Sequence, residues 1–145
     1  MERTTSDMAR ETTGSVSVLA QIANEMVRLF KEQFGRGPTR ARANWADDNV
    51  LIVVLEDTFT PAERNLVLMG EHERLREMRL FFQTATEREF CEPVERLTGR
   101  KVRAFMSAVD TLVDGLSTET FIFYPIGDEE GKASRAEIAV SPPRR

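Results

Sequence analysis

The chain repeats one local order: a long amphipathic helix pattern, a glycine that ends it, and a basic strand pattern. Gly35 ends the first helix pattern and Gly99 ends the second. A more apolar strand pattern follows each basic one. The four strand patterns occupy residues 39–45, 50–56, 101–107 and 118–124. This doubled helix-plus-β-hairpin unit predicts an α+β fold with an antiparallel sheet of about four strands and helices on one face.

Apolar residues at helical spacing predict three helices. They occupy residues 16–33, 61–69 and 71–97. The second begins with the clearest local signal in the chain, because Thr60 can cap it, Pro61 needs no amide hydrogen there, and Glu63 completes a capping box. In the third, Pro93 removes the hydrogen bond to the carbonyl of Glu89, so we expect a kink or restart around Pro93 and the two residues before it.

The length of the chain favours a single domain, and its apolar runs are too short to span a membrane. The chain has 145 residues and a formal net charge of −4. We interpret residues 1–14 as a disordered leader, 15–126 as the folded domain and 127–145 as a flexible tail. The negative charge argues against a nucleic-acid partner that covers the whole surface. The longest apolar run, residues 50–55, is much shorter than the ~20 residues of a spanning helix, so the chain is not expected to cross a membrane.

The only histidine and the only cysteine, His72 and Cys91, are poorly placed for catalysis. On one helix they would lie about 28 Å apart at ~1.5 Å per residue, whereas a nucleophile and its base need contact near ~3 Å. A single cysteine also excludes an internal disulfide and fits a reducing, cytoplasmic location. We therefore expect no catalytic residue, no cofactor, no metal site and no enzymatic activity.

Basic residues recur at matching places in the two units. They are Arg36, Arg40 and Arg42 in the first unit, and Arg100, Lys101 and Arg103 in the second. If the two first strands lie close together, these side chains gather on one face and form a candidate patch for an anion or an acidic partner. The alternative interpretation is a solvated strand face whose charges pair with nearby acids such as Glu56 and Asp57.

The second strand of each hairpin is apolar toward both faces of the sheet, at residues 50–55 and 121–124. In an antiparallel sheet with one solvent-exposed face, apolar and polar residues normally alternate along each strand. Helices on one side can bury only one of these faces, so a two-fold homodimer that buries the other is the simplest explanation. The alternative is that the C-terminal EIAV run, residues 137–140, folds back as the cover.

Three sequence blocks, GRGPT, TPAER and TGRKV, occur in this order. Through them residues 17–124 resemble the small bacterial MpsC-type family, which is named for a Na⁺-translocating, membrane-potential-generating system. Pro93 departs from the uninterrupted helix of the family pattern. The resemblance implies a non-enzymatic cytosolic accessory or regulatory protein, peripheral to the membrane, that contacts a membrane-protein partner. The alternative function is a small module that uses the basic strand face to bind a ligand, a polyanion or nucleic acid.

Overall fold

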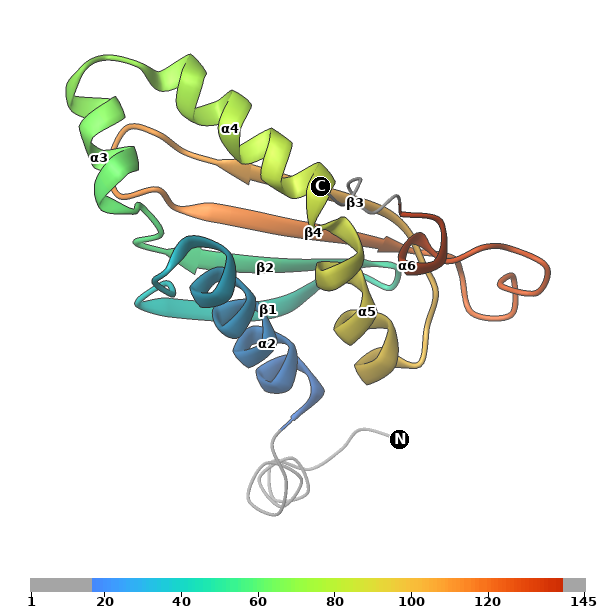
Figure 1. Cartoon of the computed structure of the whole chain (residues 1–145). Coiled ribbons are helices and arrows are strands. Elements are labelled where there is room, and N and C mark those ends of the chain that lie inside the picture. Colours follow the sequence, from blue (N-terminus) through green and yellow to red (C-terminus); the bar gives the residue numbers. More distant parts are fainter. Residues whose placement is uncertain (1–16, 140–145) are drawn as a thin grey trace, which may run out of the picture.

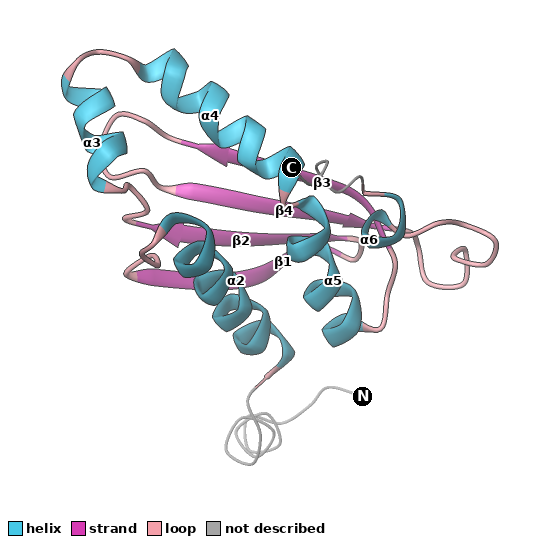
Figure 2. Ribbon diagram, viewed as in Figure 1, coloured by secondary structure: helices cyan, strands magenta, loops and turns pink. Residues whose placement is uncertain are grey.

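The computed structural model describes residues 17–139, which form a four-stranded antiparallel sheet with helices packed against one side (Figures 1 and 2). The elements are α2 (Val18–Phe34), β1 (Arg40–Asp47), β2 (Val50–Glu56), α3 (Pro61–Leu68), α4 (His72–Ala85), α5 (Glu87–Thr98), β3 (Val102–Val109), β4 (Ser117–Phe123) and α6 (Arg135–Ile138). The strand order is β1-β2-β4-β3. The α+β class and the four-stranded sheet are confirmed. That the two helix-and-hairpin segments are copies of one unit stays a prediction.

Strict alternation along the central strands sorts the side chains into an inner and an outer face. In β2, Leu51, Val53 and Leu55 are buried and their neighbours are partly exposed. Leu51 pairs with Phe121 of β4, and Phe121 pairs in turn with Phe105 of β3. Residues that pair directly point to the same side of a sheet. These residues therefore form the inner face, which the helices cover.

The sequence signals for the helix ends are present in the structure. The Ser17 side chain caps α2 by accepting from the amide of Ala20 at 3.1 Å. Gly35 ends the helix at φ 83°, in the left-handed region that favours glycine. Thr60 and Glu63 form the predicted capping box at the start of α3. Each cap satisfies amides or carbonyls that a helix end leaves without partners.

The predicted helix at 71–97 is wrong in one respect, because it breaks at Thr86 and not at Pro93. The Thr86 hydroxyl donates to the carbonyl of Phe82 at 2.6 Å, which competes with the helical pattern. Thr86 has φ −114° and ψ 13°, so the chain turns there. Pro93 lies buried inside α5. The turn lets α4 run along β3 while α5 packs against α2.

The fold continues beyond residue 126, where the sequence predicted that a tail begins. Ser134 caps the short helix α6, and Ala139 after it is only 5% exposed. Arg88 of α5 donates to the carbonyl of Ala139 at 2.8 Å. The predicted leader, 1–14, and residues 140–145 of the predicted tail lie outside the described residues. Within residues 17–139, no helix is both long enough and apolar enough to span a membrane.

Candidate functional site

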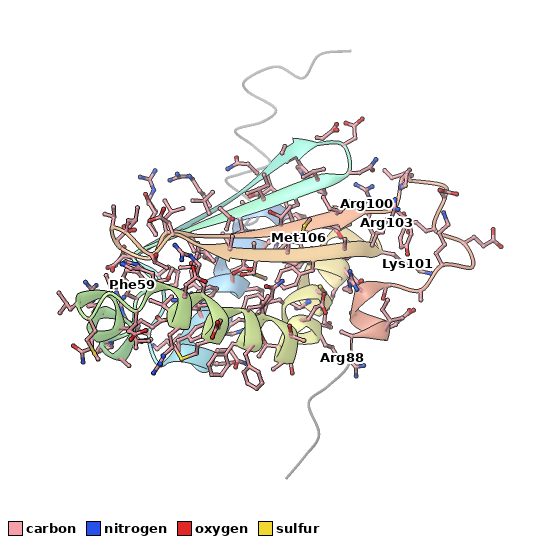
Figure 3. The ribbon with its side chains drawn as sticks, turned by 90° about the horizontal axis from the view of Figure 1, so that it is seen from above. Phe59, Arg88, Arg100, Lys101, Arg103 and Met106 are labelled. Carbon is pink, nitrogen blue, oxygen red and sulfur yellow. The ribbon has the colours of Figure 1, made fainter. Side chains whose placement is uncertain are left out.

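The outer face of the sheet lies on the side away from the helices and is mostly apolar over β2, β4 and β3, whereas β1 contributes Arg40, Arg42 and Asn44 to it (Figure 3). Its apolar residues are Val50, Ile52 and Val54 of β2, Ala104, Met106 and Ala108 of β3, and Ile122 of β4. Met106 is 51% exposed, although it is a large apolar side chain. Thr118 and Thr120 of β4 complete the centre of this surface. The predicted second apolar face of the sheet is therefore present, and no helix within residues 17–139 covers it.

The C-terminal EIAV run does not cover this face over its described residues. Glu137 and Ile138 belong to α6, which packs against α5 and β3. The amide of Ala136 and the amide of Val102 both lie within hydrogen-bond distance of Glu95 Oε1, at 3.4 and 3.1 Å. These contacts place α6 on the helical side, beside the start of β3. Self-association through this face stays a prediction.

The helical side contains a buried ion pair between Glu63 of α3 and Arg79 of α4. Their side chains are 1% and 9% exposed. Arg79 donates to both carboxylate oxygens of Glu63 and to the hydroxyl of Thr58, the latter at 3.0 Å. Its guanidinium also lies 4.6 Å from the ring centre of Phe34. Buried charges are tolerated when they are paired and hydrogen-bonded in this way.

A second buried carboxyl, Glu119, lies on the inner face of β4 and is only 2% exposed. The Ser107 hydroxyl donates to Glu119 Oε1 at 2.9 Å, whereas Oε2 is buried without a hydrogen-bond partner among the described residues. Burial raises the pKa of Glu119 to about 8, although the Ser107 hydrogen bond and the charge of Arg79 oppose this. The protonated form of Glu119 is therefore favoured up to a higher pH than in a solvent-exposed glutamate.

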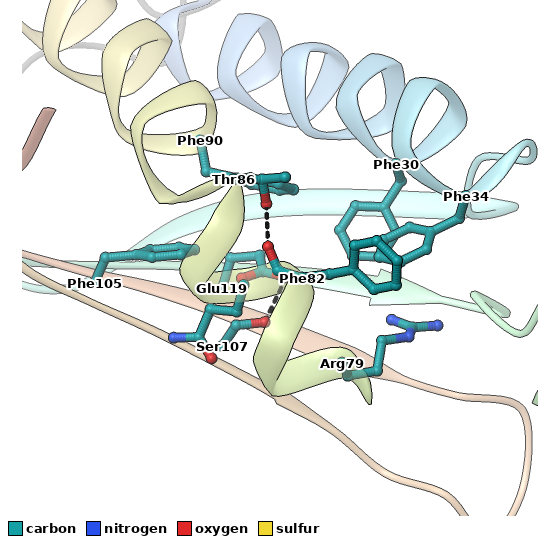
Figure 4. Close-up of a pocket in the computed structure, with 10 residues that line it drawn as sticks. Phe30, Phe34, Arg79, Phe82, Thr86, Phe90, Phe105, Ser107 and Glu119 are labelled. Carbon is teal, nitrogen blue, oxygen red and sulfur yellow. Dashed lines mark hydrogen bonds between the residues drawn. The ribbon is translucent and has the colours of Figure 1, made fainter. Parts of the chain in front are cut away.

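Glu119 lines a small cavity under α4 (Figure 4). Five phenylalanine rings and the side chains of Arg79, Gln83, Thr86 and Ser107 complete its walls. The rings are those of Phe30, Phe34, Phe82, Phe90 and Phe105. At about 20 Å³, the cavity has room for roughly one water molecule. A wider cleft of about 390 Å³ adjoins it and shares Arg79, Gln83 and Ser107 with it.

The six basic residues of the candidate patch do not share one surface. β1 and β3 are the two edge strands, at opposite sides of the sheet, so the two first strands do not lie together. Arg40 and Arg42 approach Glu56 at 3.6 and 3.7 Å, as the alternative interpretation expected. Arg103 lies exposed on β3, at the far edge (Figure 3). Binding of an anion at either edge stays a prediction.

The other three basic residues hold loops in place. Arg36 donates to the carbonyls of Asp57 and Phe59. Arg100 donates to three groups near the β1–β2 turn and the end of β4, and its guanidinium lies 4.9 Å from the ring centre of Phe123. Lys101 donates to the carbonyl of Lys132 at 2.8 Å. These contacts are structural roles that the sequence did not reveal.

His72 and Cys91 lie on different helices, and each has a local role. His72 Nδ1 is 2.8 Å from the hydroxyl of Thr111, which joins the start of α4 to the β3–β4 loop. Cys91 is fully buried in the core, and burial raises the pKa of its thiol. Among the described residues, no group of three or more His, Cys, Asp or Glu side chains is arranged to hold a metal ion. The absence of catalysis stays a prediction.

Comparison with known families places this geometry in context. Residues 15–124 match the family described as Na⁺-translocating membrane potential-generating system (MpsC). The chain belongs to the MpsC family. The match spans every strand of the sheet and helices α2 to α5. The chain matches no curated protein and no solved structure.

The MpsC match ends at residue 124, so it includes Glu63, Arg79 and Glu119 but not α6. Sequence reasoning missed Glu119 as a notable residue. The sequence did contain the indication. Glu119 lies two and four residues before Phe121 and Phe123 on one strand, so all three side chains point to the same face. It missed Arg79 because the ion pair joins residues from two helices, a contact that local patterns do not contain.

Proposed function

We propose that this MpsC-family chain is a non-enzymatic accessory or regulatory protein that acts by protein–protein contact. The observation that carries the proposal is the outer face, where seven apolar residues lie on three adjacent strands away from the helices. Contiguous apolar patches of this kind mark interaction surfaces in many proteins. The family description supports a place beside a Na⁺-translocating membrane system. A location in the cytoplasm, peripheral to the membrane, is part of the proposal.

The first partner is a second copy of the chain. Two sheets that pack face to face bury their apolar residues and close with two-fold symmetry. Three strands at ~4.8 Å spacing and seven residues at ~3.3 Å rise give a flat apolar area of roughly 330 Å². Two such faces bury roughly 670 Å², less than the ~1,200–2,000 Å² of stable interfaces. We therefore expect a dimer that forms at micromolar concentration and dissociates on dilution.

The second partner is a protein of the membrane system. The test is co-purification of the tagged chain from a native membrane fraction. We expect a membrane protein to be recovered with the unmodified chain and to be lost with Ile52→Lys, which places a charge at the centre of the outer face. Leu68→Lys is the matched control, because Leu68 is 84% exposed on α3, away from this face. If the unmodified chain never associates with a membrane complex, the accessory role loses its support.

The alternative function, binding of a polyanion by the basic residues, needs a different test. The basic groups occupy opposite edges of the sheet, so we do not favour a single large patch. Charge-driven binding weakens steeply with salt. A screen of RNA, DNA and anionic lipid at ~50 mM salt, repeated with Arg40, Arg42 and Arg103 changed to Ala, would detect it.

A further inference from the structure

The end of α4 is a weak part of the helical layer. The hydroxyls of Thr84 and Thr86 donate to the carbonyls of Leu80 and Phe82, four residues earlier, at 3.1 and 2.6 Å. Such bonds compete with the hydrogen bonds of a helix and weaken or bend it. Within α4, which the structure describes in full, only one residue is buried, whereas α2 has five buried residues. The end of α4 is therefore held by little buried apolar surface.

This part of α4 forms one wall of the cavity that Glu119 lines. Phe82, Gln83 and Thr86 lie on the helical side of the cavity, and Glu119 and Ser107 lie on the sheet side (Figure 4). The wider cleft between α4 and β3 shares Gln83 and Ser107 with the cavity, but Glu119 does not line it. An outward movement of Gln83 would therefore join the cavity to the cleft.

Few groups near Glu119 could stabilise its charged form. Ser107 donates to Oε1, and Oε2 has no hydrogen-bond partner among the described residues. The cation that acts on Glu119 from α4 is Arg79, which Glu63 of α3 already neutralises. Cys91 of α5 lies within electrostatic range, and burial raises the pKa of its thiol, so it stays neutral. Loss of the Glu119 proton would therefore leave a surplus negative charge inside the protein.

A buried carboxylate without enough partners is stabilised most directly by water. The cavity has room for roughly one water molecule at about 20 Å³, whereas the adjoining cleft has about 390 Å³. The strand that carries Glu119, β4, pairs with β2 and β3 on its two sides, so it cannot move without breaking the sheet. The end of α4 is the more easily displaced wall.

We propose that residues 80–86 form a pH-sensitive gate over the buried carboxyl of Glu119. When Glu119 releases its proton to water, the gate moves outward, the cavity joins the cleft, and water reaches the carboxylate. Opening also separates the rings of Phe34 and Phe82, whose centres are 5.6 Å apart in the closed form. The pH therefore controls an apolar surface on the helical side. This regulation goes beyond the outer-face contact and does not depend on it.

The direction of the pH effect follows from proton linkage. Burial raises the pKa of Glu119 from 4.5 to about 8 while the gate is closed, and contact with water in the open form returns it toward 4.5. Opening is therefore coupled to release of a proton. The open fraction rises with pH between these two values, by up to about tenfold per pH unit, and levels off above the higher one.

The test is amide hydrogen exchange of the intact chain from pH 5 to pH 9, corrected for the intrinsic effect of pH on exchange. The amide of Thr86 donates to the carbonyl of Phe82 at 2.9 Å and reports on the gate. We expect its protection to fall by about tenfold or more between pH 6 and pH 8. At both values it should stay below the protection of Met26 and Phe30 in α2, because the gate opens without unfolding of the chain.

Three variants separate the gate from a general effect of pH. Glu119→Gln removes the titrating carboxyl and should abolish the pH dependence at Thr86. Glu77→Gln is the matched control, because Glu77 is exposed on the same helix, and it should keep that dependence. Ser107→Ala removes a hydrogen bond that lowers the pKa of Glu119, so the fall in protection should continue to a higher pH before it levels off.

Two kinds of result would overturn the proposal. Protection at Thr86 equal to that in α2 would show that exchange requires unfolding of the whole chain. A pH dependence that persists in Glu119→Gln would assign it to another group. If Glu119→Gln does not fold, Ser107→Ala decides, and a fall that ends at the same pH as in the unmodified chain would count against Glu119 as the controlling group.

Discussion

The two faces of the same sheet differ in what covers them. On the inner face Phe121 is fully buried under the helices, whereas on the outer face Met106 is 51% exposed. Both faces are rich in apolar side chains, because β2 carries them toward both sides and β3 and β4 add to each face. Burial under the helices explains the inner set as the core of the monomer. The outer set contributes little to that core, and we propose that a contact with another chain buries it.

The inner face also differs from a purely apolar core. It holds the Glu63–Arg79 pair and the buried carboxyl of Glu119 under α4, whereas the residues under α2 are apolar. Buried polar groups cost stability unless their partners are complete. The incomplete hydrogen bonding of Glu119, whose Oε2 has no partner among the described residues, therefore lowers the stability of the monomer.

The largest expected effect is the difference in stability between a substitution on the inner face and one on the outer face of the sheet. Phe121→Ala removes a fully buried ring and should lower the free energy of unfolding by about 3–5 kcal/mol. Ile122→Ala, one residue along on the outer face, should cost the monomer clearly less because its side chain is partly exposed. Urea denaturation at a concentration below dimerisation measures both. Equal losses would show that the outer face is as well buried as the inner one.

Breaking the buried ion pair should have a comparable effect. Glu63→Gln leaves the Arg79 guanidinium buried without its counter-charge, and about 3–5 kcal/mol of stability should be lost. Glu73→Gln is the matched control, since Glu73 pairs with Arg76 on the surface and is 83% exposed. Exposed pairs contribute about 0–1 kcal/mol. Thermal unfolding of both variants tests the difference, and similar melting temperatures would contradict it.

Stability should depend on pH through Glu119. Its pKa is raised from 4.5 to about 8, mainly by burial. Between these values the folded chain holds a proton that the unfolded chain has lost, so the free energy of unfolding falls as pH rises through this window and levels off above it. The total change is on the order of a few kcal/mol. Glu119→Gln should remove most of this slope in melting temperatures between pH 5 and pH 9, and an unchanged slope would assign it to other groups.

The smallest expected effect concerns the cap of α3. Thr60→Ala removes the side chain that accepts from the amide of Glu63 at 3.1 Å and should cost about 1 kcal/mol. Ser17→Ala at the start of α2 is the companion change, because the Ser17 cap is exposed. Chemical denaturation distinguishes these losses from zero. A loss above ~3 kcal/mol in Thr60→Ala would mean that the change also disturbs the nearby Glu63–Arg79 pair.

Local chemistry allowed much of the fold to be predicted from the sequence. Gly35, Thr60 and Gly99 mark helix ends through short-range hydrogen bonds, and alternation locates the strands. The break at Thr86 was not predictable from Pro93, because it follows from how α4 and α5 pack on different parts of the sheet. Strand order likewise depends on long-range contacts. For this reason the sequence could not show that β1 and β3 occupy opposite edges and separate the basic residues.

The most direct test of the account is the mass of the intact chain in solution, measured by light scattering over a range of micromolar concentrations. We expect the mass to rise with concentration from 16.5 kDa toward twice that value. Ile52→Lys on the outer face should stay at 16.5 kDa, and Leu68→Lys should behave as the unmodified chain. A mass of 16.5 kDa at every concentration, or an Ile52→Lys variant that still dimerises, would contradict the claim that the outer face is a contact surface between copies.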